Sequence, residues 1–268
     1  MIRLKEYAKE LQIELTDEQI GMFKAYYEML IETNKVMNLT AITELDEVIT
    51  KHFIDSIALA KAYPDINANI SGDYNGYNDN GYIDSSEALV FKDTDGRTRS
   101  SFSVLDLGTG AGFPGIPLKI AFPDLNIVLM DSLNKRVKFL KAVIDELGLQ
   151  GITAIHGRAE EMARQKNYRE QFDICVSRAV ANLSTLSEYC LPFVKSDGCF
   201  ISYKSADIEE ELSDASNAIN ILGGKLTAVK KLTLPGSDIE RAFVIIHKTK
   251  KTPKTYPRKA GTATKNPL

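Results

Sequence analysis

The residues best suited to chemistry in this sequence lie in a glycine-rich stretch, SVLDLGTGAGFPGIPL, at positions 103–118. A short apolar run precedes Gly108, Gly110 and Gly112, which predicts a strand followed by a loop that can approach a ligand closely. Gly110, Gly112 and Gly115 also spell G-x-G-x-x-G, the pattern of dinucleotide-binding loops. Such loops follow strands in enzymes that bind phosphates, dinucleotides or S-adenosylmethionine, so the glycines alone leave the ligand open.

An acidic residue ends the next predicted strand, IVLMD, at Asp131. A carboxylate at the end of the second strand can accept hydrogen bonds from both hydroxyls of a ribose. Dinucleotides and S-adenosylmethionine both carry a ribose. Asp131 therefore predicts a ribose contact and leaves both ligands open.

The chemistry around the glycines favours S-adenosylmethionine. Asp106 places a carboxylate where a pyrophosphate would be repelled, whereas the ammonium and sulfonium of S-adenosylmethionine would be attracted. Pro114 and Pro117 remove backbone N–H donors from the helix start that would hold a phosphate. After the third predicted strand, Ala159 and Glu160 in HGRAEE can meet an adenine with their backbone amides.

S-adenosylmethionine indicates a methyl transfer, and the end of the fourth predicted strand bears on which acceptor atom is methylated. It carries Ser177-Arg178-Ala179, whereas enzymes that methylate exocyclic amines commonly have Asn or Asp followed by two prolines. Cys175 lies inside the strand without a neighbouring proline, which argues against a cysteine nucleophile that attacks a pyrimidine. A ring nitrogen with a free lone pair, such as guanine N7, remains, and its methylation needs placement more than a general base.

Alternating strands and helices must position these residues. Strands are predicted at 104–107, 127–131, 152–156, 172–177 and 199–204, and helices near 115–122, 133–148, 158–166, 183–194 and 206–222. This rhythm predicts a parallel sheet with helices on both faces. Two further runs, 225–234 and 241–249, suit an antiparallel pair at the edge of the sheet.

Two helices are predicted before the sheet. Thr16 and Gln19 form a capping box before a helical pattern over 17–36, and a second pattern covers 44–62. On the second helix His52, Asp55 and Ser56 share one polar face. Three residues so close together leave no oxyanion donors beside the serine, so a hydrolytic triad is a poor interpretation. The Asn- and Gly-rich stretch 65–102 predicts a long loop with a surface hairpin near its end.

The composition is that of a globular protein with unevenly distributed charge. The 268 residues are 44% hydrophobic, no apolar run reaches the roughly 20 residues of a membrane-spanning helix, and the first residues do not resemble a secretory signal, so we expect a cytoplasmic protein. The net charge is −3, but residues 248–268 contain seven Lys or Arg and no acid, which leaves −10 for the rest. A basic arm on an acidic body fits a contact with RNA. The three cysteines have no metal or redox spacing and are expected to be plain buried thiols.

Eight ordered blocks of the sequence resemble the 16S ribosomal RNA guanine-N7 methyltransferases, the glucose-inhibited division protein B (RsmG) family. The blocks are NKVMNLTAI, HFIDS, LDLGTGAGFPGIPL, DSLNKRVKFL, GRAEE, SRAVA, Lys204 after the fifth strand, and YPRKAGTATKNPL. The resemblance implies a class I S-adenosylmethionine-dependent methyltransferase fold, an α/β, Rossmann-like fold with a mostly parallel seven-stranded sheet, an antiparallel edge and an N-terminal helical extension. It also implies S-adenosylmethionine as methyl donor, and as acceptor N7 of a guanine at position 527, in the 530-region loop of 16S rRNA in the small ribosomal subunit.

Site residues follow from the same resemblance by matching position. The expected cofactor site consists of Asp106, Gly108, Gly110, Gly112, Phe113, Asp131, Ala159, Glu160 and Arg178. The expected substrate side consists of Asn38, His52, Asp55, Ser56, Arg136, Lys204, Arg258 and Lys259. Among these, Arg178, Lys204, His52 and Asp55 are expected to position the reacting groups, with no general base and no metal ion.

Several alternatives stay open on the sequence alone. A nicotinamide-dependent oxidoreductase is disfavoured by the loop chemistry, and a ribosome-binding module without transfer activity by the intact glycine loop and Asp131. Individual residues also have structural interpretations: Arg178 as an ion-pair partner, His52 as a satisfied helix histidine, and Asp131 as a cap of the following helix. We expect a monomer with a helical segment at 1–64, a loop at 65–102, a methyltransferase core at 103–250 and a basic tail at 251–268.

Overall fold

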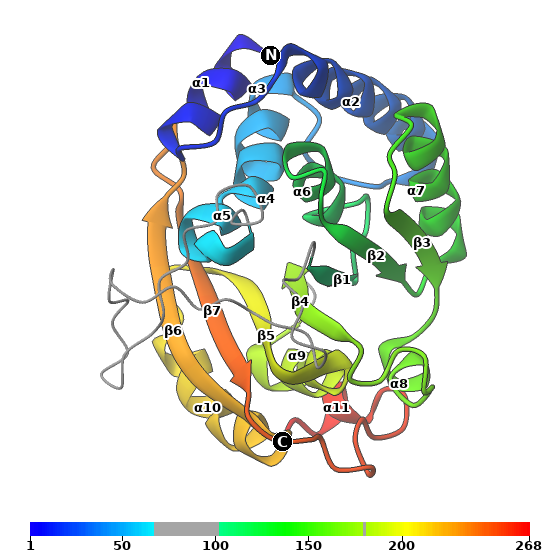
Figure 1. The fold of residues 1–268 in the computed structure, drawn as a ribbon, viewed down its shortest axis with the longest axis vertical. Helices are drawn as coiled ribbons and strands as arrows, with labels where there is room; N and C mark the ends of the chain where they lie inside the picture. The colour runs from blue at the N-terminus through cyan, green and yellow to red at the C-terminus, as the bar shows by residue number, and fades with distance from the viewer. Residues whose placement is uncertain (67–101, 179–180) are drawn as a thin grey trace, which may run out of the picture.

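The computed structural model describes residues 1–66, 102–178 and 181–268, and its centre is a seven-stranded sheet (Figure 1). The strands are β1 (Ser103–Leu107), β2 (Asn126–Asp131), β3 (Ile152–His156), β4 (Phe172–Arg178), β5 (Val194–Ser205), β6 (Gly224–Thr233) and β7 (Glu240–Lys248). Their order is β3-β2-β1-β4-β5-β7-β6, with β1 to β5 parallel and β7 antiparallel to both β5 and β6. The predicted fold, with its antiparallel edge, is confirmed.

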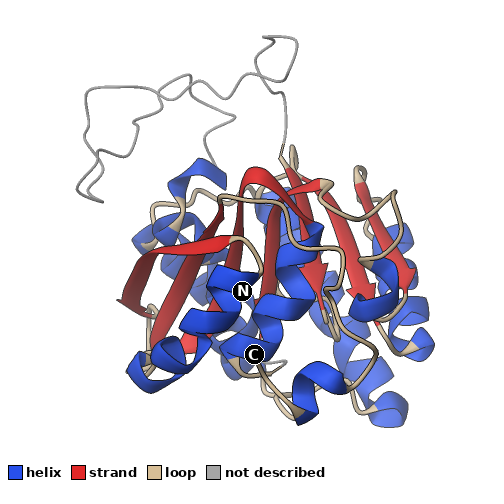
Figure 2. Cartoon of the chain, turned by 90° about the horizontal axis from the view of Figure 1, so that it is seen from below, coloured by secondary structure: helices blue, strands red, loops and turns tan. Residues whose placement is uncertain are grey.

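Successive residues of the central strands pack on opposite faces of the sheet, because side chains alternate along a strand. Val104 and Ile174 belong to the hydrophobic core on one face, and Leu105 and Cys175 to the core on the other. Both faces are covered by helices, as Figure 2 shows, so the residues that point to either face of these strands are mostly apolar. All three cysteines are free and buried, as predicted.

One face is covered by the N-terminal helices together with the helices that follow β1 and β2. These are α1 (Ile2–Glu10), α2 (Asp17–Met37), α6 (Gly115–Ala121) and α7 (Asn134–Glu146). Helix α2 begins at the predicted capping box: Thr16 Oγ1 accepts from the Gln19 amide and Gln19 Oε1 accepts from the Thr16 amide. The sequence analysis did not predict α1. The N-terminal helices share one hydrophobic core with the sheet, so they pack as one body with it.

The helix predicted over 44–62 is present but interrupted. It comprises α3 (Leu45–Val48), a π-helical turn η1 (Ile49–Ile54), α4 (Asp55–Ile57) and α5 (Leu59–Ala62). Residues 52–60 are all buried, and the Tyr203 hydroxyl of β5 donates to the Ser56 carbonyl at 2.9 Å. The polar face of this helix is therefore packed against the sheet instead of solvent. π-helical turns occur frequently at functional sites, and here the turn contains His52.

The other face is covered by α8 (Ala159–Met162), α9 (Leu183–Cys190), α10 (Glu209–Ile221) and the short α11 (Thr262–Lys265). Helix α8 is shorter than predicted, and a 3₁₀ turn η4 (Leu191–Phe193) completes the helix predicted to reach residue 194.

The basic C-terminal segment folds back onto this second face. The Arg169 guanidinium donates to the carbonyl oxygens of Thr252, Pro253 and Tyr256. The fully buried Lys248 ammonium donates to the carbonyl of Leu191 at 2.5 Å. The tail is thus tied to the protein by its own backbone, and the cations it exposes are Lys250, Lys251, Lys254, Lys259 and Lys265.

Most of the stretch 65–102, including the hairpin predicted near its end, lies outside the described residues. Its start is a 3₁₀ turn η2 (Pro64–Ile66) that follows α5. Within the part of the chain that the structure describes, no helix has the length and apolar character needed to cross a membrane.

Candidate active site

The glycine loop between β1 and α6 adopts backbone conformations that residues with a side chain rarely adopt. Gly108, Gly110 and Gly112 have φ angles of 72°, 62° and 108°, in the left-handed region that glycine adopts most readily. A Cβ atom at Gly112 would lie 2.7 Å from the Tyr26 hydroxyl, whereas one at Gly110 would meet nothing within 4 Å. The loop is therefore packed from behind at Gly112 and open at Gly110, where a ligand can approach.

Helix α2 holds this loop in place. The buried Tyr26 hydroxyl donates to the Ala111 carbonyl at 2.5 Å. The side-chain amide of Gln19 donates through Nε2 to the Ile120 carbonyl at the end of α6 at 2.7 Å. Sequence reasoning did not identify Tyr26 as part of the site, because it lies far from the loop along the chain and looks like an ordinary core aromatic.

Asp106 braces the loop from inside the sheet. Its Oδ2 accepts from the Thr109 hydroxyl at 2.6 Å and from the Gly115 amide at 2.8 Å. The carboxyl is fully buried, and this burial raises the pKa of Asp106 to about 7. Its Oδ1 is buried without a hydrogen-bond partner. Asp106 thus uses Oδ2 to brace the loop, while its Oδ1 has no hydrogen-bond partner.

Asp131 lies at the end of β2, next to the same loop. Its Oδ2 accepts from the Gly110 amide at 2.9 Å and its Oδ1 from the Leu133 amide at 2.8 Å. The second bond is to the backbone N–H of Leu133, the N-cap of α7, so it lies just before the helix and does not cap its first turn. The first bond places the carboxylate beside Gly110, as a ribose contact requires. Arg136 stands farther off, with its Nη1 at 3.5 Å from Oδ2.

These features fit S-adenosylmethionine. The ends of β1, β2 and β3 are adjacent in the sheet, and ligands of open α/β sheets bind outside the carboxyl ends of the strands. Gly110 gives an open backbone, Asp131 a carboxylate of the kind that can accept from ribose hydroxyls, and Asp106 a buried, unpaired oxygen. Ala159 and Glu160 stand at the start of α8, just after β3, and Glu160 Oε1 accepts from the Gly261 amide of the tail at 3.1 Å.

Arg178, the last residue of β4, joins this loop to the polar residues of the π-helical turn. Its Nη1 donates to the Lys51 carbonyl at 3.0 Å and to Asp55 Oδ2 at 2.6 Å, and its Nη2 lies 3.2 Å from His52 Nδ1. The guanidinium also stands over the Phe113 ring, 5.1 Å from its centroid, at a distance typical of a cation–π contact. Arg178 is thus both the ion-pair partner of Asp55 and a neighbour of the glycine loop.

His52 lies beside Nη2 of the same Arg178 guanidinium. Its ring stacks on Phe113 with centroids 4.3 Å apart, and its Nε2 lies 2.8 Å from Thr40 Oγ1. Nδ1 also lies 3.1 Å from the Lys51 carbonyl. The contact with Arg178 needs a bare Nδ1, because a guanidinium can only donate, whereas the contact with the carbonyl needs a protonated one. Burial, and secondly the positive charge of Arg178, lower the pKa of His52 to about 3. The imidazole is therefore neutral at physiological pH and a poor proton acceptor.

A pocket of about 400 Å³ opens beside these residues. It is lined by Ile42, Lys51, His52, Asp55, Arg178, Tyr203, Lys204, Ser205, Ile239 and Arg241. Four of these side chains are cations at neutral pH, and the only carboxylate, Asp55, has 1% of its side chain exposed. Lys51 is paired with Glu47 and Lys204 with Glu211. The pocket and its partners therefore keep a small positive excess, which suits a ligand with acceptor oxygens or phosphates.

Lys204, the second-to-last residue of β5, lines this pocket. Its ammonium donates to the Ala181 carbonyl at 2.7 Å and to Glu211 Oε1 at 2.5 Å. Arg241 also lines the pocket, and sequence reasoning missed it because it considered only residues that follow the strands. Arg241 stands at the beginning of β7, and the antiparallel register pairs it with Ser205 at the end of β5. The antiparallel direction expected of residues 241–249 was the signal that could have found it, because it brings the start of this strand to the carboxyl edge of the parallel strands.

The other predicted substrate residues are not gathered into this pocket. Ser56 is fully buried, and its hydroxyl donates to the His52 carbonyl at 2.5 Å. Asn38 is the exposed, left-handed C-cap of α2, and the nearby Asn34 braces that loop by accepting from the Leu39 and Thr40 amides.

Two further predicted substrate residues lie in the tail. Arg258 forms a bidentate pair with Glu188, 2.6 Å at its closest, on the second face of the sheet. Lys259, its neighbour, is exposed. The RNA contacts expected of these residues stay predictions.

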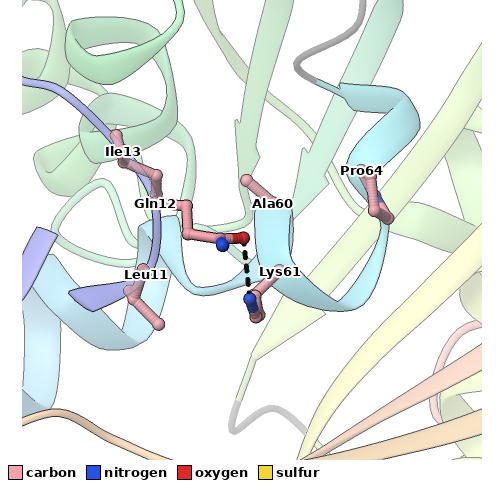
Figure 3. Close-up of a pocket in the computed structure, with 6 residues that line it drawn as sticks. All are labelled: Leu11, Gln12, Ile13, Ala60, Lys61 and Pro64. Carbon is pink, nitrogen blue, oxygen red and sulfur yellow. Dashed lines mark hydrogen bonds between the residues drawn. The ribbon is translucent and has the colours of Figure 1, made fainter. Parts of the chain in front are cut away.

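A second pocket, of about 240 Å³, lies elsewhere and shares no lining residue with the first (Figure 3). Leu11, Gln12 and Ile13 face Ala60, Lys61 and Pro64 across it. Its one polar contact between lining residues joins Lys61 Nζ to Gln12 Oε1 at 2.8 Å. Nothing in this lining gives it chemistry comparable to the pocket beside Arg178.

The sequence of the chain matches a described protein family over most of its length. Residues 19–72 and 83–242 match the model of GidB: rRNA small subunit methyltransferase G. The chain belongs to this family. The oxidoreductase and the inactive binding module are not supported by the match.

Curated relatives extend the family match to almost the whole chain. Ribosomal RNA small subunit methyltransferase G of Lachnoclostridium phytofermentans is 48% identical over 260 residues, which cover 97% of this chain and 94% of that protein. The protein of the same name from Desulforamulus reducens is 48% identical over 267 residues, 100% of this chain and 98% of the relative. The one from Lactococcus lactis strain IL1403 is 45% identical over 97% of this chain and 95% of the relative.

Proposed function

We propose that this member of the GidB family transfers the methyl group of S-adenosylmethionine to N7 of a guanine in 16S rRNA. The single observation that carries the proposal is the direct contact between the glycine loop and the residues that line the basic pocket. Phe113 of the glycine loop stacks on His52 and lies under Arg178, and both residues line the basic pocket. A donor bound on the loop and a base bound in the pocket would be neighbours.

The residues of the chain would divide the work by location. Gly108, Gly110, Phe113 and Asp131 would hold the cofactor, with Ala159 and Glu160 beside the adenine. Lys204 and Arg178 would bind the O6 edge of the guanine or a phosphate, since N7 must stay open for the methyl group. His52 and Asp55 would keep Arg178 in place.

The proposed chemistry makes few demands on acid or base groups. Bound S-adenosylmethionine supplies a methyl group on a positively charged sulfur, and the charge moves to the guanine with the methyl group. The guanine N7 lone pair needs no deprotonation, which agrees with the low pKa of His52 and with the pairing of Lys204 to Glu211. The contribution of the protein is then mostly orientation of the two reactants.

The names of the relatives support the small ribosomal subunit as the target. The exposed lysines of the tail, among them Lys254 and Lys259, would add salt-dependent contacts to RNA phosphates. A ribosomal substrate would place the protein in the cytoplasm, and a monomer remains our expectation.

The decisive experiment offers labelled S-adenosylmethionine with unmodified 16S rRNA, naked and within small-subunit particles. The modified position is mapped by chain cleavage at N7-methylguanine. Label at one guanine of the 530-region loop would support donor, atom and substrate together. Cofactor binding without labelled RNA would refute the acceptor, and absence of cofactor binding would refute the methyltransferase assignment.

A further inference from the structure

The Asp55 carboxylate is shared by two arginines from different strands. Arg178 Nη1 donates to its Oδ2 at 2.6 Å and Arg241 Nε to its Oδ1 at 2.6 Å. Asp55 has 1% of its side chain exposed, Arg178 11% and Arg241 20%. The result is a nearly dehydrated triad with one excess positive charge, in which each carboxylate oxygen serves one guanidinium.

This sharing determines how Arg178 binds. An arginine and a carboxylate on their own prefer a bidentate contact through two parallel N–H···O bonds. With Oδ1 taken by Arg241, Arg178 contacts Asp55 through Nη1 alone. Its Nη2 is then free to reach His52 Nδ1, and the guanidinium stays over the Phe113 ring.

Arg241 is itself held at the correct place by the sheet. The antiparallel pairing of β7 with β5 sets it opposite Ser205, and its Nη1 lies 3.5 Å from the Lys204 carbonyl. Its position is thus fixed by backbone register rather than by a loop, which is the arrangement that positions a neighbouring group best.

We infer that Arg241 is a positioning residue for the methyl transfer: by occupying Asp55 Oδ1 it keeps Arg178 in its single-contact orientation against His52 and Phe113. The inference rests on the proposed function for its kinetic consequence. The geometric consequence is separate, because without Arg241 the guanidinium of Arg178 would turn to take both oxygens of Asp55 and leave His52.

The kinetic test compares Arg241→Gln with Arg241→Lys. We expect R241Q to lower kcat by roughly 10- to 100-fold, with KM for the RNA and Kd for S-adenosylmethionine within about twofold, and R241K, which keeps a cation for Oδ1, to recover part of the loss. The matched control is Arg3→Gln, which removes another arginine–aspartate pair, with Asp46, that lies outside the pocket. A rise in KM with unchanged kcat would make Arg241 an RNA contact and overturn the inference.

The geometric test follows the imidazole of His52 by NMR titration. Besides Arg178, the charged groups around it are Lys51 of its own turn and the Asp55–Arg241 pair. His156→Gln and His247→Gln variants assign the resonances, since the chain has three histidines. In R241Q the departure of Arg178 should raise the pKa of His52 from its low value, and in R241K the pKa should rise less.

An unchanged His52 titration in both Arg241 variants would overturn the inference even if kcat fell. If wild-type protein methylates no RNA, the proposed function fails, yet the titration still decides the role of Arg241. If R241Q does not fold, the R241K protein carries both measurements, with smaller shifts in the same direction.

Discussion

The guanidinium carbon of Arg178 lies 5.1 Å from the centroid of the Phe113 ring, so the end of β4 touches the glycine loop that follows β1. These two strands are neighbours where the strand order reverses, the place at which open α/β sheets bind their ligands. The contact therefore connects the glycine loop with the basic pocket.

Asp131→Asn should weaken the binding of S-adenosylmethionine about tenfold or more, since hydrogen bonds to a charged group contribute roughly 1.5–3 kcal/mol. Isothermal titration calorimetry measures the change. Asp145→Asn, an exposed position near the other end of α7, is the matched control and should bind normally. Equal affinities for wild type and D131N would remove Asp131 from the cofactor site.

Tyr26→Phe should destabilise the protein by about 1–3 kcal/mol, because the buried Ala111 carbonyl loses its donor, and should also weaken cofactor binding. Urea unfolding gives the stability and calorimetry the affinity. In Tyr27→Phe the lost hydroxyl bond, to the Thr43 carbonyl, is exposed, so little change is expected. If the two variants behaved alike, α2 would not brace the glycine loop.

Lys204→Ala should reduce methyl transfer while leaving the Kd of S-adenosylmethionine nearly unchanged, because Lys204 lies in the basic pocket and is bonded away from the glycine loop. Single-turnover transfer and cofactor titration separate the two effects. Lys225→Ala, on an exposed position of β6, provides the comparison. A parallel loss of transfer and cofactor binding would contradict the assignment of Lys204 to the substrate side.

Arg258→Ala should destabilise the protein toward the low end of the roughly 3–5 kcal/mol found when a buried ion pair is broken. The reason is that Glu188, 1% exposed, would keep a charge without a guanidinium partner. Urea unfolding and limited proteolysis of the tail measure this.

Lys259→Ala should leave stability unchanged, because its side chain is exposed, and should lower the salt dependence of RNA binding by about one unit of log K against log salt. Filter binding over a range of salt concentrations tests it. An unchanged slope would mean that Lys259 does not contact RNA.

For the preceding variant, an R258A protein as stable as wild type would mean that the tail is not anchored by Glu188.

Asp106 should make the protein less stable as pH rises from about 4 to 7. Its pKa is about 7 in the folded protein against an ordinary value of 3.8, so in this window the folded state retains a proton that the unfolded chain releases. The free energy of unfolding then falls by up to about 1.4 kcal/mol per pH unit, and the contribution is constant above pH 7.

Asp106→Asn removes this dependence, so its unfolding free energy relative to wild type should rise across the same pH range. Other groups that titrate there, such as Asp65 with a pKa raised to about 6, are common to both proteins and cancel in the difference. Asp207→Asn, an exposed position, should show a flat difference. A flat difference for D106N as well would show that Asp106 is ionised like an exposed aspartate.

The sequence by itself determined the local features of this protein. The capping box of α2, the strands, the glycine loop and Asp131 at the end of β2 follow from short-range patterns, since helical and strand periodicities and glycine conformations depend on neighbouring residues. For the same reason the strand-end rule located Arg178 and Lys204.

Which helix faces are buried, and which distant segments contact each other, became known only from the three-dimensional structure. Helical spacing placed His52, Asp55 and Ser56 on one polar face, but it could not show that this face packs on the sheet, because burial depends on partners distant in sequence. The composition of the tail could not show that Arg258 turns inward to Glu188. Arg241 reached the pocket because β7 runs antiparallel to β5, so its first residues share an edge with the last residues of the parallel strands.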